Sequence, residues 1–147
     1  MIVTFCGHGD KYYDAQTEKK LLLCVEKLIK EGAKEFLLGG YGDFDHLAAR
    51  TVKQLKGFYP HITSTLVIPY IHRTYDNTIY DGSVYPPIEN VPNKYAISKR
   101  NEWMIQKSDV LVCYISHTHG GAYKTYEYCL RKKKRIINLA HKINPQE

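Results

Sequence analysis

Two glycine-rich turns have the residue types and the spacing to hold an anion. Gly39-Gly40-Tyr41-Gly42 follows a short apolar run and precedes a helical pattern that begins near Asp43. Ser116-His117-Thr118-His119-Gly120-Gly121 stands in the same relation to the apolar run 110–115 and the helical pattern over 121–132. A glycine-rich turn at a helix start presents unpaired backbone N–H groups beside the positive end of the helix dipole, which favours phosphate. Two such turns predict a site for a phosphate-bearing, nucleotide-derived small molecule.

An arginine and an aspartate are placed where they could contact such a ligand. Arg100, in the segment Ser98-Lys99-Arg100-Asn101-Glu102, could hold a phosphate or carboxylate through its guanidinium, and a surface ion pair would explain it equally well. Asp45, or Asp43 beside it, could cap the helix that begins there, or Asp45 could face the cleft and hold sugar hydroxyls. Ser98 is the predicted N-cap of the helix that carries Arg100.

Glu127, seven residues after Gly120, is the candidate for bond-breaking chemistry. If the last helix starts at the glycines, Glu127 lies about two turns into it and could point toward the cleft. A carboxylate there could stabilise positive charge on a ribose ring as a base departs. Glu127 and Arg100 would then be the catalytic residues, and a solvated helical glutamate is the simpler alternative.

Neither the histidines nor the cysteines are spaced as a metal site. His8, His117 and His119 belong to no HExxH motif or Cys/His quartet, so we expect no metal and no cofactor. Hydrogen bonding to phosphate, or a place in a polar loop, is the expected role of these histidines. The four cysteines form no CxxC pair and are expected to be reduced, buried thiols.

The charge and hydropathy of the sequence indicate which kinds of partner the protein has. With Lys+Arg 21 against Asp+Glu 15, the 147-residue chain has a formal net charge of +6, which suits an anionic partner, small molecule or nucleic acid. The run 131–135 is the strongest basic feature of the sequence. It could be the solvated end of a helix, or it could contact nucleic acid. Residues 1–5 predict a strand rather than a signal peptide, and no apolar run approaches the ~20 residues that span a membrane. We therefore expect a cytoplasmic protein without membrane partners.

Strand and helix patterns alternate along the chain. Strands are expected at 2–6, 35–38, 63–68, 110–115 and 135–139, and helices between Asp14 and Gly32 and at 43–56, 96–106 and 121–132. This alternation predicts an α/β fold, a Rossmann-like three-layer sandwich with a mainly parallel sheet of about five strands and helices on both faces. The carboxyl ends of the strands should converge on one cleft. Residues 1–147 should form a single domain, with the aperiodic segment 70–95 as a lid over the site.

Several motifs, in this order, resemble the SLOG superfamily, and its small YpsA-like branch of bacteria and phages in particular. They are Phe5-Cys6-Gly7-His8, residues 39–45, Lys99-Arg100-Asn101-Glu102-Trp103-Met104, Ser108-Asp109, and Gly120-Gly121 leading to Glu127. The resemblance implies a Rossmann-like domain that binds nucleotides or nucleotide-derived signals. The superfamily includes lonely-guy (LOG) phosphoribohydrolases, DNA-processing DprA/Smf proteins and sensor domains of antiphage systems.

The resemblance to the LOG enzymes is incomplete at one motif. Their signature PGGxGTxxE is matched by Gly120, Gly121 and Glu127, whereas His119, Tyr123 and Lys124 replace its proline, its third glycine and its threonine. Tyr123 would put a bulky ring where a phosphate needs close backbone approach. The resemblance therefore implies ligand binding more strongly than phosphoribohydrolase activity.

Three functions follow, from different classes. The leading prediction is the sensing or sequestering of a nucleotide-derived small molecule, by a chain that could be a homodimer or higher homo-oligomer. The alternatives are an N-glycosidic hydrolase of nucleoside monophosphates, with Glu127 and Arg100 catalytic, and a single-stranded DNA-binding accessory protein. The predicted ligand-binding residues are Gly7, His8, Gly39, Gly40, Gly42, Asp45, Arg100, Asn101, Ser116, His117, Gly120, Gly121 and Lys124.

Overall fold

Six parallel strands form one sheet. The computed structural model describes residues 1–71, 74–76 and 78–140. In these residues the strand order is β4-β3-β2-β1-β5-β6, and every neighbouring pair runs parallel. The strands are β1 (Ile2–Gly7), β2 (Glu35–Leu38), β3 (Thr63–Val67), β4 (Gly82–Val84), β5 (Val110–Tyr114) and β6 (Arg135–Asn138). The predicted α/β Rossmann-like class is confirmed, with six strands in place of about five.

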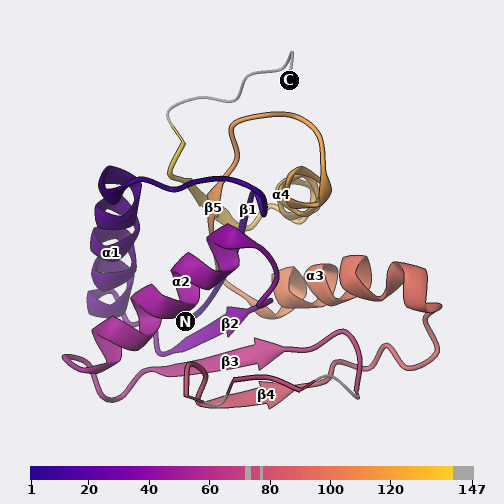
Figure 1. The fold of residues 1–147 in the computed structure, drawn as a ribbon, viewed down its shortest axis with the longest axis horizontal. Helices are drawn as coiled ribbons and strands as arrows, with labels where there is room; N and C mark the ends of the chain where they lie inside the picture. Colours follow the sequence, from indigo (N-terminus) through magenta and orange to yellow (C-terminus); the bar gives the residue numbers. More distant parts are fainter. Residues whose placement is uncertain (72–73, 77, 141–147) are drawn as a thin grey trace.

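In the described part of the chain, four α-helices cover the two faces of this sheet (Figure 1). They are α1 (Ala15–Lys30), α2 (Asp43–Lys56), α3 (Ala96–Lys107) and α4 (Gly121–Arg131). Helices α1 and α2 pack against each other on one face, and α3 and α4 pack together on the other. Strand β2 pairs with one edge of β1, and β5 pairs with the opposite edge of β1. The sheet therefore has its topological switch point between β1 and β5, where folds of this type bind ligands.

Helix α1 shows how local sequence sets the boundaries of an element. Its N-cap is Asp14, whose carboxylate accepts a hydrogen bond from the backbone N–H of Thr17 at 2.9 Å. The helix ends before Gly32, whose φ of 113° and backbone bond to Ile29 are those of a C-terminal glycine. Leu21, Val25, Leu28 and Ile29 make the buried apolar stripe of this helix and belong to the hydrophobic core.

One predicted helix cap is wrong, and one of two open alternatives at another helix start is excluded. Helix α2 begins after Gly42, which is its N-cap, so neither Asp43 nor Asp45 caps it with a side chain. Helix α3 begins at Ala96 with Tyr95 as the N-cap, and Ser98 lies within the helix. In the second case the short 3₁₀ helix Asn93–Tyr95 leads directly into α3, so the chain is already helical before it reaches the serine.

The segment 70–95 contains a strand that the sequence pattern did not predict. Strand β4 is three residues long and pairs with β3 at the edge of the sheet. The carboxylate of Asp81, just before it, accepts a hydrogen bond from the backbone N–H of Ser64 at 2.8 Å and ties the segment to β3. Positions 72–73 and 77 of the predicted lid lie outside the described residues, and its role as a lid stays a prediction.

The cysteines are free thiols. Cys6, Cys113 and Cys129 are buried, as expected, whereas Cys24 is only half-buried. Among the described residues, no helix is long and apolar enough to cross a membrane.

Candidate functional site

Two neighbouring cavities open at the carboxyl ends of the strands. The first, of about 400 Å³, lies beyond β2 and β3, and the second, of about 410 Å³, lies beyond β1 and β5. Arg100 and Tyr41 line both, so they form the wall between them. The predicted single cleft is therefore divided: Gly39 and Gly40 line the first cavity, and Gly120 and Gly121 line the second.

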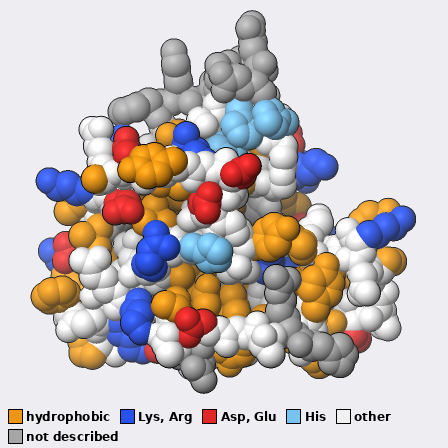
Figure 2. Space-filling model, in the orientation of Figure 1, with side chains coloured by type: hydrophobic (Ala, Val, Ile, Leu, Met, Phe, Trp, Pro, Cys, Tyr) orange, Lys and Arg blue, Asp and Glu red, His pale blue; other side chains and the backbone are white. Residues whose placement is uncertain are grey.

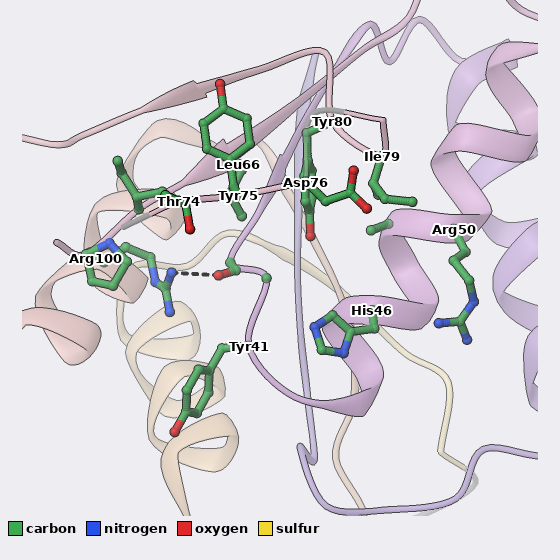
Figure 3. Close-up of a pocket in the computed structure, with 15 residues that line it drawn as sticks. Tyr41, His46, Arg50, Leu66, Thr74, Tyr75, Asp76, Ile79, Tyr80 and Arg100 are labelled. Carbon is green, nitrogen blue, oxygen red and sulfur yellow. Dashed lines mark hydrogen bonds between the residues drawn. The ribbon is translucent and has the colours of Figure 1, made fainter. Parts of the chain in front are cut away.

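The first cavity is walled by tyrosines and apolar side chains. His46 and Arg50 enter from α2, and Tyr75, Asp76 and Tyr80 enter from the segment before β4 (Figure 3). Figure 2 shows cationic and histidine side chains beside hydrophobic ones on this face of the molecule. The lining residues are Gly39, Gly40, Tyr41, His46, Ala49, Arg50, Leu66, Ile68, Pro69, Thr74, Tyr75, Asp76, Ile79, Tyr80 and Arg100.

The second cavity lies at the topological switch point of the sheet. It gathers the end of β1, the start of α3 and the loop that opens α4. Asn101 and Asp45 bring polar side chains to it from α3 and α2. Its lining residues are Phe5, Cys6, Gly7, His8, Gly9, Asp10, Tyr41, Asp45, Ile97, Arg100, Asn101, Met104, His117, His119, Gly120, Gly121, Ala122 and Thr125.

Arg100 is a buried arginine that holds backbone carbonyls. Only 2% of its surface is exposed. Its Nη1 donates to the carbonyl oxygens of Gly39 at 2.8 Å and Val67 at 2.7 Å, and the dashed line in Figure 3 marks the bond to Gly39. Its Nε donates to Oδ1 of Asn101 at 2.9 Å. Arg100 therefore fixes the ends of β2 and β3, and it brings positive charge to the wall between the cavities.

Asp45 lies beside Arg100 and close to Gly39. A Cβ atom at Gly39 would lie 3.0 Å from Oδ2 of Asp45 and 3.3 Å from Cζ of Arg100. The backbone N–H of Tyr41 donates to Oδ2 of Asp45 at 3.1 Å. Burial raises the pKa of Asp45 to about 6, although the Tyr41 N–H and the Arg100 charge oppose the rise. Asp45 is thus a carboxyl that can change its protonation near neutral pH inside the second cavity.

Three histidine rings form a column at the mouth of the second cavity. His8 and His117 stack at a centroid distance of 3.6 Å, and His117 and His119 stack at 3.9 Å. His8 is buried, and its Nε2 accepts a hydrogen bond from the backbone N–H of Ser116 at 2.9 Å. Burial, and then the neighbouring charges of His117, Lys11 and His119, lower the pKa of His8 to about 4. The inner ring is therefore neutral, while His119 at the other end is exposed.

The turn before α4 has open space in front of it. Gly120 is the N-cap, with a φ of 91° that favours glycine, and Gly121 is the first helical residue. A Cβ atom at either glycine would meet no heavy atom within 4 Å. Gly120, Gly121 and Ala122 line the second cavity, so the start of α4 borders it, and a helix start is a place that favours an anion.

The other turn glycines are explained by packing inside the protein. A Cβ at Gly7 would lie 2.3 Å from Cγ of Phe44, and one at Gly42 would lie 2.6 Å from Cα of Gly9. At Gly40, with a φ of 65°, it would lie 2.6 Å from Cδ1 of Leu66. These glycines allow close packing around the cavities, whatever the ligand.

Four predicted site residues line neither cavity. They are Gly42, Ser116, Lys124 and Glu127, whereas the other predicted residues line one cavity or both. Ser116 acts through its N–H on His8. Glu127 is half-buried in the middle of α4, away from the lining of either cavity.

Several lining residues were not predicted as site residues from the sequence. Tyr41 and His119 lie in the two glycine-rich turns, so their position next to the glycines was an available signal. His46 and Arg50 lie one turn apart on α2, and only the packing of that helix shows which way they face. Among the described residues, no group of three His, Cys, Asp or Glu side chains is placed to hold a metal ion.

The basic run at the end of α4 is largely engaged within the chain. Lys134 donates to the carbonyl oxygen of Ser108 at 3.0 Å, and Arg135 pairs with Glu31 at 2.9 Å. Arg131 and Lys132 lie over the ring of Tyr128. Arg131 and Lys132 lie at the C-terminal end of α4, where cations complement the helix dipole, whereas Arg135 begins β6.

Known proteins resemble this chain in structure. No family model matches the sequence, and no curated protein matches it. DNA processing protein A from Helicobacter pylori, which has a single-stranded DNA binding mode, matches with a TM-score of 0.65 at 17% identity over 92% of this chain and 63% of its own. DprA from Streptococcus pneumoniae matches with a TM-score of 0.65 at 16% identity over 91% of this chain and 48% of its own. The molybdenum cofactor carrier protein of Chlamydomonas reinhardtii matches with a TM-score of 0.63 at 16% identity over 99% of this chain and 79% of its own.

These matches concern the fold. This chain spans 63% and 48% of the lengths of the two DNA processing proteins. The shared architecture is a Rossmann-like α/β fold, and the SLOG and YpsA-like assignments stay predictions.

Proposed function

We propose that this chain binds a nucleotide-derived, phosphate-bearing small molecule in the second cavity. The observation that carries the proposal is the position of that cavity at the switch point between β1 and β5, with Gly120 and Gly121 at the start of α4 among its lining residues. Its volume of about 410 Å³ is in the range of small-molecule sites. The buried cation of Arg100 adds to the attraction for an anion.

The likeness in fold supports a binding role without naming the ligand. One matched protein carries the molybdenum cofactor, and another binds single-stranded DNA. Both are consistent with a cleft that accepts anionic ligands.

A charge placed at the start of α4 tests the proposal. Gly121→Asp adds a carboxylate where the phosphate would sit, and there is open space for its side chain. An acidic residue in the first turn suits the helix dipole, so the fold should tolerate it. Thermal shift with nucleoside mono- and diphosphates and cyclic nucleotides should show stabilisation of the wild type, by roughly 2.7 kcal/mol at a hundredfold the dissociation constant. Gly121→Asp should lose that stabilisation.

A matched control introduces the same charge at another helix start. Gln16 is exposed in the first turn of α1 and lines neither cavity. Gln16→Asp should bind as the wild type does. If no nucleotide stabilises the wild type, or if both variants bind equally well, the second cavity is not a phosphate site.

Single-stranded DNA binding is the second candidate, favoured by the net charge of +6 and by the likeness in fold to DNA processing protein A. Lys132 and Lys133 are exposed at the end of α4. Neutralising both as glutamine should reduce the salt dependence of oligonucleotide binding by roughly one unit of slope per lost contact. An unchanged slope excludes this patch.

The hydrolase alternative requires a carboxylate at the ligand. Glu127 lines neither cavity, which weakens its case as the catalytic residue. Release of free base from a nucleoside monophosphate by the wild type, lost in Glu127→Gln, would restore that alternative. A homo-oligomer stays a prediction, which light scattering after gel filtration would test.

A further inference from the structure

Among the described residues, the only ring recorded as stacked on His119 is that of His117, so His119 is the outer end of the histidine column. His8 is buried at its inner end, His117 lies in the middle, and His119 is exposed at the outer end. The two ring pairs are near parallel, with interplanar angles of 14° and 19°. In Figure 2 histidine side chains gather at the top of the view, where Figure 1 draws the loop that leads into α4.

Hydrogen bonds and ring contacts within the fold fix the inner end of the histidine column. The Ser116 N–H fixes the His8 ring through Nε2, and the His8 backbone carbonyl accepts a hydrogen bond from the Tyr13 hydroxyl at 2.7 Å. Tyr114 meets the His8 ring edge-on at a centroid distance of 6.5 Å. His117 and His119 then stack outward, so His119 is presented on a preorganised support. Preorganisation reduces the entropy lost when a second ring stacks on it.

We propose that His119 is the stacking platform for the base of the ligand, whose phosphate lies at Gly120 and Gly121. This inference rests on the proposed function. A nucleobase is a planar aromatic ring, and it would add one more layer to the column. His119 and the two glycines are consecutive in the chain and all line the second cavity, so base and phosphate would be held by one turn. The ligand class is therefore a free nucleotide with an accessible base.

The contribution of such a platform is measurable. Base stacking on an aromatic side chain contributes about 1–3 kcal/mol per base by alanine substitution, which is roughly a 5- to 150-fold change in the dissociation constant. The effect should depend on a flat aromatic face and not on an imidazole nitrogen. A phenylalanine should replace His119, whereas an alanine should not.

The test uses calorimetric titration of the four ribonucleoside 5′-monophosphates, with ribose 5-phosphate and inorganic phosphate as base-free probes. His119→Ala should weaken nucleotide binding by about 5- to 150-fold. His119→Phe should bind within about threefold of the wild type, a difference of under 1 kcal/mol. Ribose 5-phosphate should bind weakly and equally to all three proteins. His61→Ala, at an exposed histidine outside both cavities, is the control and should not change binding.

Each outcome has one meaning. If ribose 5-phosphate binds the wild type as tightly as the nucleotides do, or if His119→Phe binds as weakly as His119→Ala, the stacking proposal is wrong while phosphate binding stands. If neither the nucleotides nor the base-free probes bind, the proposed function fails as well. An oligonucleotide that binds much more tightly than its mononucleotide, in a manner lost in His119→Ala, would assign the platform to a single strand and overturn the free nucleotide.

Discussion

The backbone N–H of Ser116 donates a hydrogen bond to Nε2 of His8, and so joins the loop after β5 to the end of β1. Because Nε2 is the acceptor, the His8 ring is neutral and carries its proton on Nδ1. The bond connects residues 108 positions apart in the chain. It fixes the first ring of the histidine column at the switch point of the sheet.

This bond predicts a loss of stability in acid. The unfolded chain protonates His8 near pH 6.5, whereas burial and the neighbouring charges hold its pKa in the fold at about 4. The stabilising contribution is therefore complete above pH 6.5 and is lost as the pH falls through 4, by about 3 kcal/mol in all. His8→Gln keeps an acceptor for the Ser116 N–H without a titrating ring. Denaturant unfolding at pH 7.5, 5.5 and 4 should show a shallower acid loss in His8→Gln than in the wild type.

The matched control for this prediction is His61→Gln, at an exposed histidine away from the column. It should follow the wild type across the same pH range. Parallel profiles for the wild type and His8→Gln would show that His8 does not set the acid sensitivity.

Although Arg100 lines both cavities, it should also contribute strongly to the free energy of unfolding. Arg100→Met removes the donor to the Gly39 and Val67 carbonyls and leaves buried acceptors without it. We expect a loss of about 2–4 kcal/mol in the free energy of unfolding. Lys99→Met, one position earlier on the exposed side of α3, should change it by about 0.5 kcal/mol or less, because its ion pair with Glu102 is at the surface. Equal effects of the two substitutions in urea unfolding would contradict the structural role of Arg100.

Local pattern was enough to predict most of the elements. The expected bounds of β2 and α2 coincide with those in the structure, because an apolar run and an amphipathic stripe each mark their residues. Strand β4 was not predicted, because its three residues carry no pattern and, among the described residues, it lies at the edge of the sheet and pairs with β3 alone. The prediction of Ser98 as the N-cap was wrong because the 3₁₀ helix Asn93–Tyr95 leads into α3 before the chain reaches Ser98.

The candidate site was predictable only as a region. The glycine-rich turns identified the sheet edge, since carboxyl ends of parallel strands meet there. The division into two cavities depends on Arg100 reaching a carbonyl 61 residues away, a contact that no local pattern encodes. The position of Glu127 similarly depends on how α4 is rotated against the sheet.

Gly7 should be intolerant of any side chain. A Cβ atom there would lie 2.3 Å from Cγ of Phe44, which is itself fully buried. Gly7→Ala should therefore lower the free energy of unfolding by about 1–3 kcal/mol through overpacking. Gly82→Ala is the control, since its Cβ meets nothing within 4 Å, and it should change stability by about 0.5 kcal/mol or less.

The clash between a side chain at position 7 and the ring of Phe44 can be tested directly by changing Phe44. In Gly7→Ala/Phe44→Leu the smaller side chain makes room for the new methyl group. The double variant should be more stable than the sum of the two single losses predicts, by about 0.5 kcal/mol or more. Strict additivity in denaturant unfolding would show that the methyl group and the ring do not meet.

Asp45 should have the opposite pH dependence to His8. Its pKa is about 6 in the fold, raised mainly by burial from an ordinary value of 3.8. Ionised Asp45 therefore destabilises the fold above pH 6, and this cost is removed as the pH falls toward 3.8. The shift corresponds to about 3 kcal/mol, and about 1–2 kcal/mol is expected in practice because the side chain is partly exposed.

Asp45→Asn removes the charge and keeps an oxygen that can accept from the Tyr41 N–H. It should stabilise the protein at pH 7.5 by about 1–2 kcal/mol and have little effect at pH 4, where the wild-type carboxyl is already protonated. Asp81→Asn is the contrasting control, because burial raises the pKa of Asp81 but its contacts with Lys56 and Ser64 together outweigh burial and lower the pKa overall. That variant should destabilise at pH 7.5. A destabilised Asp45→Asn at neutral pH would instead mean that Arg100 and Tyr41 require the charged carboxylate, and that the second cavity keeps its anion at all working pH values.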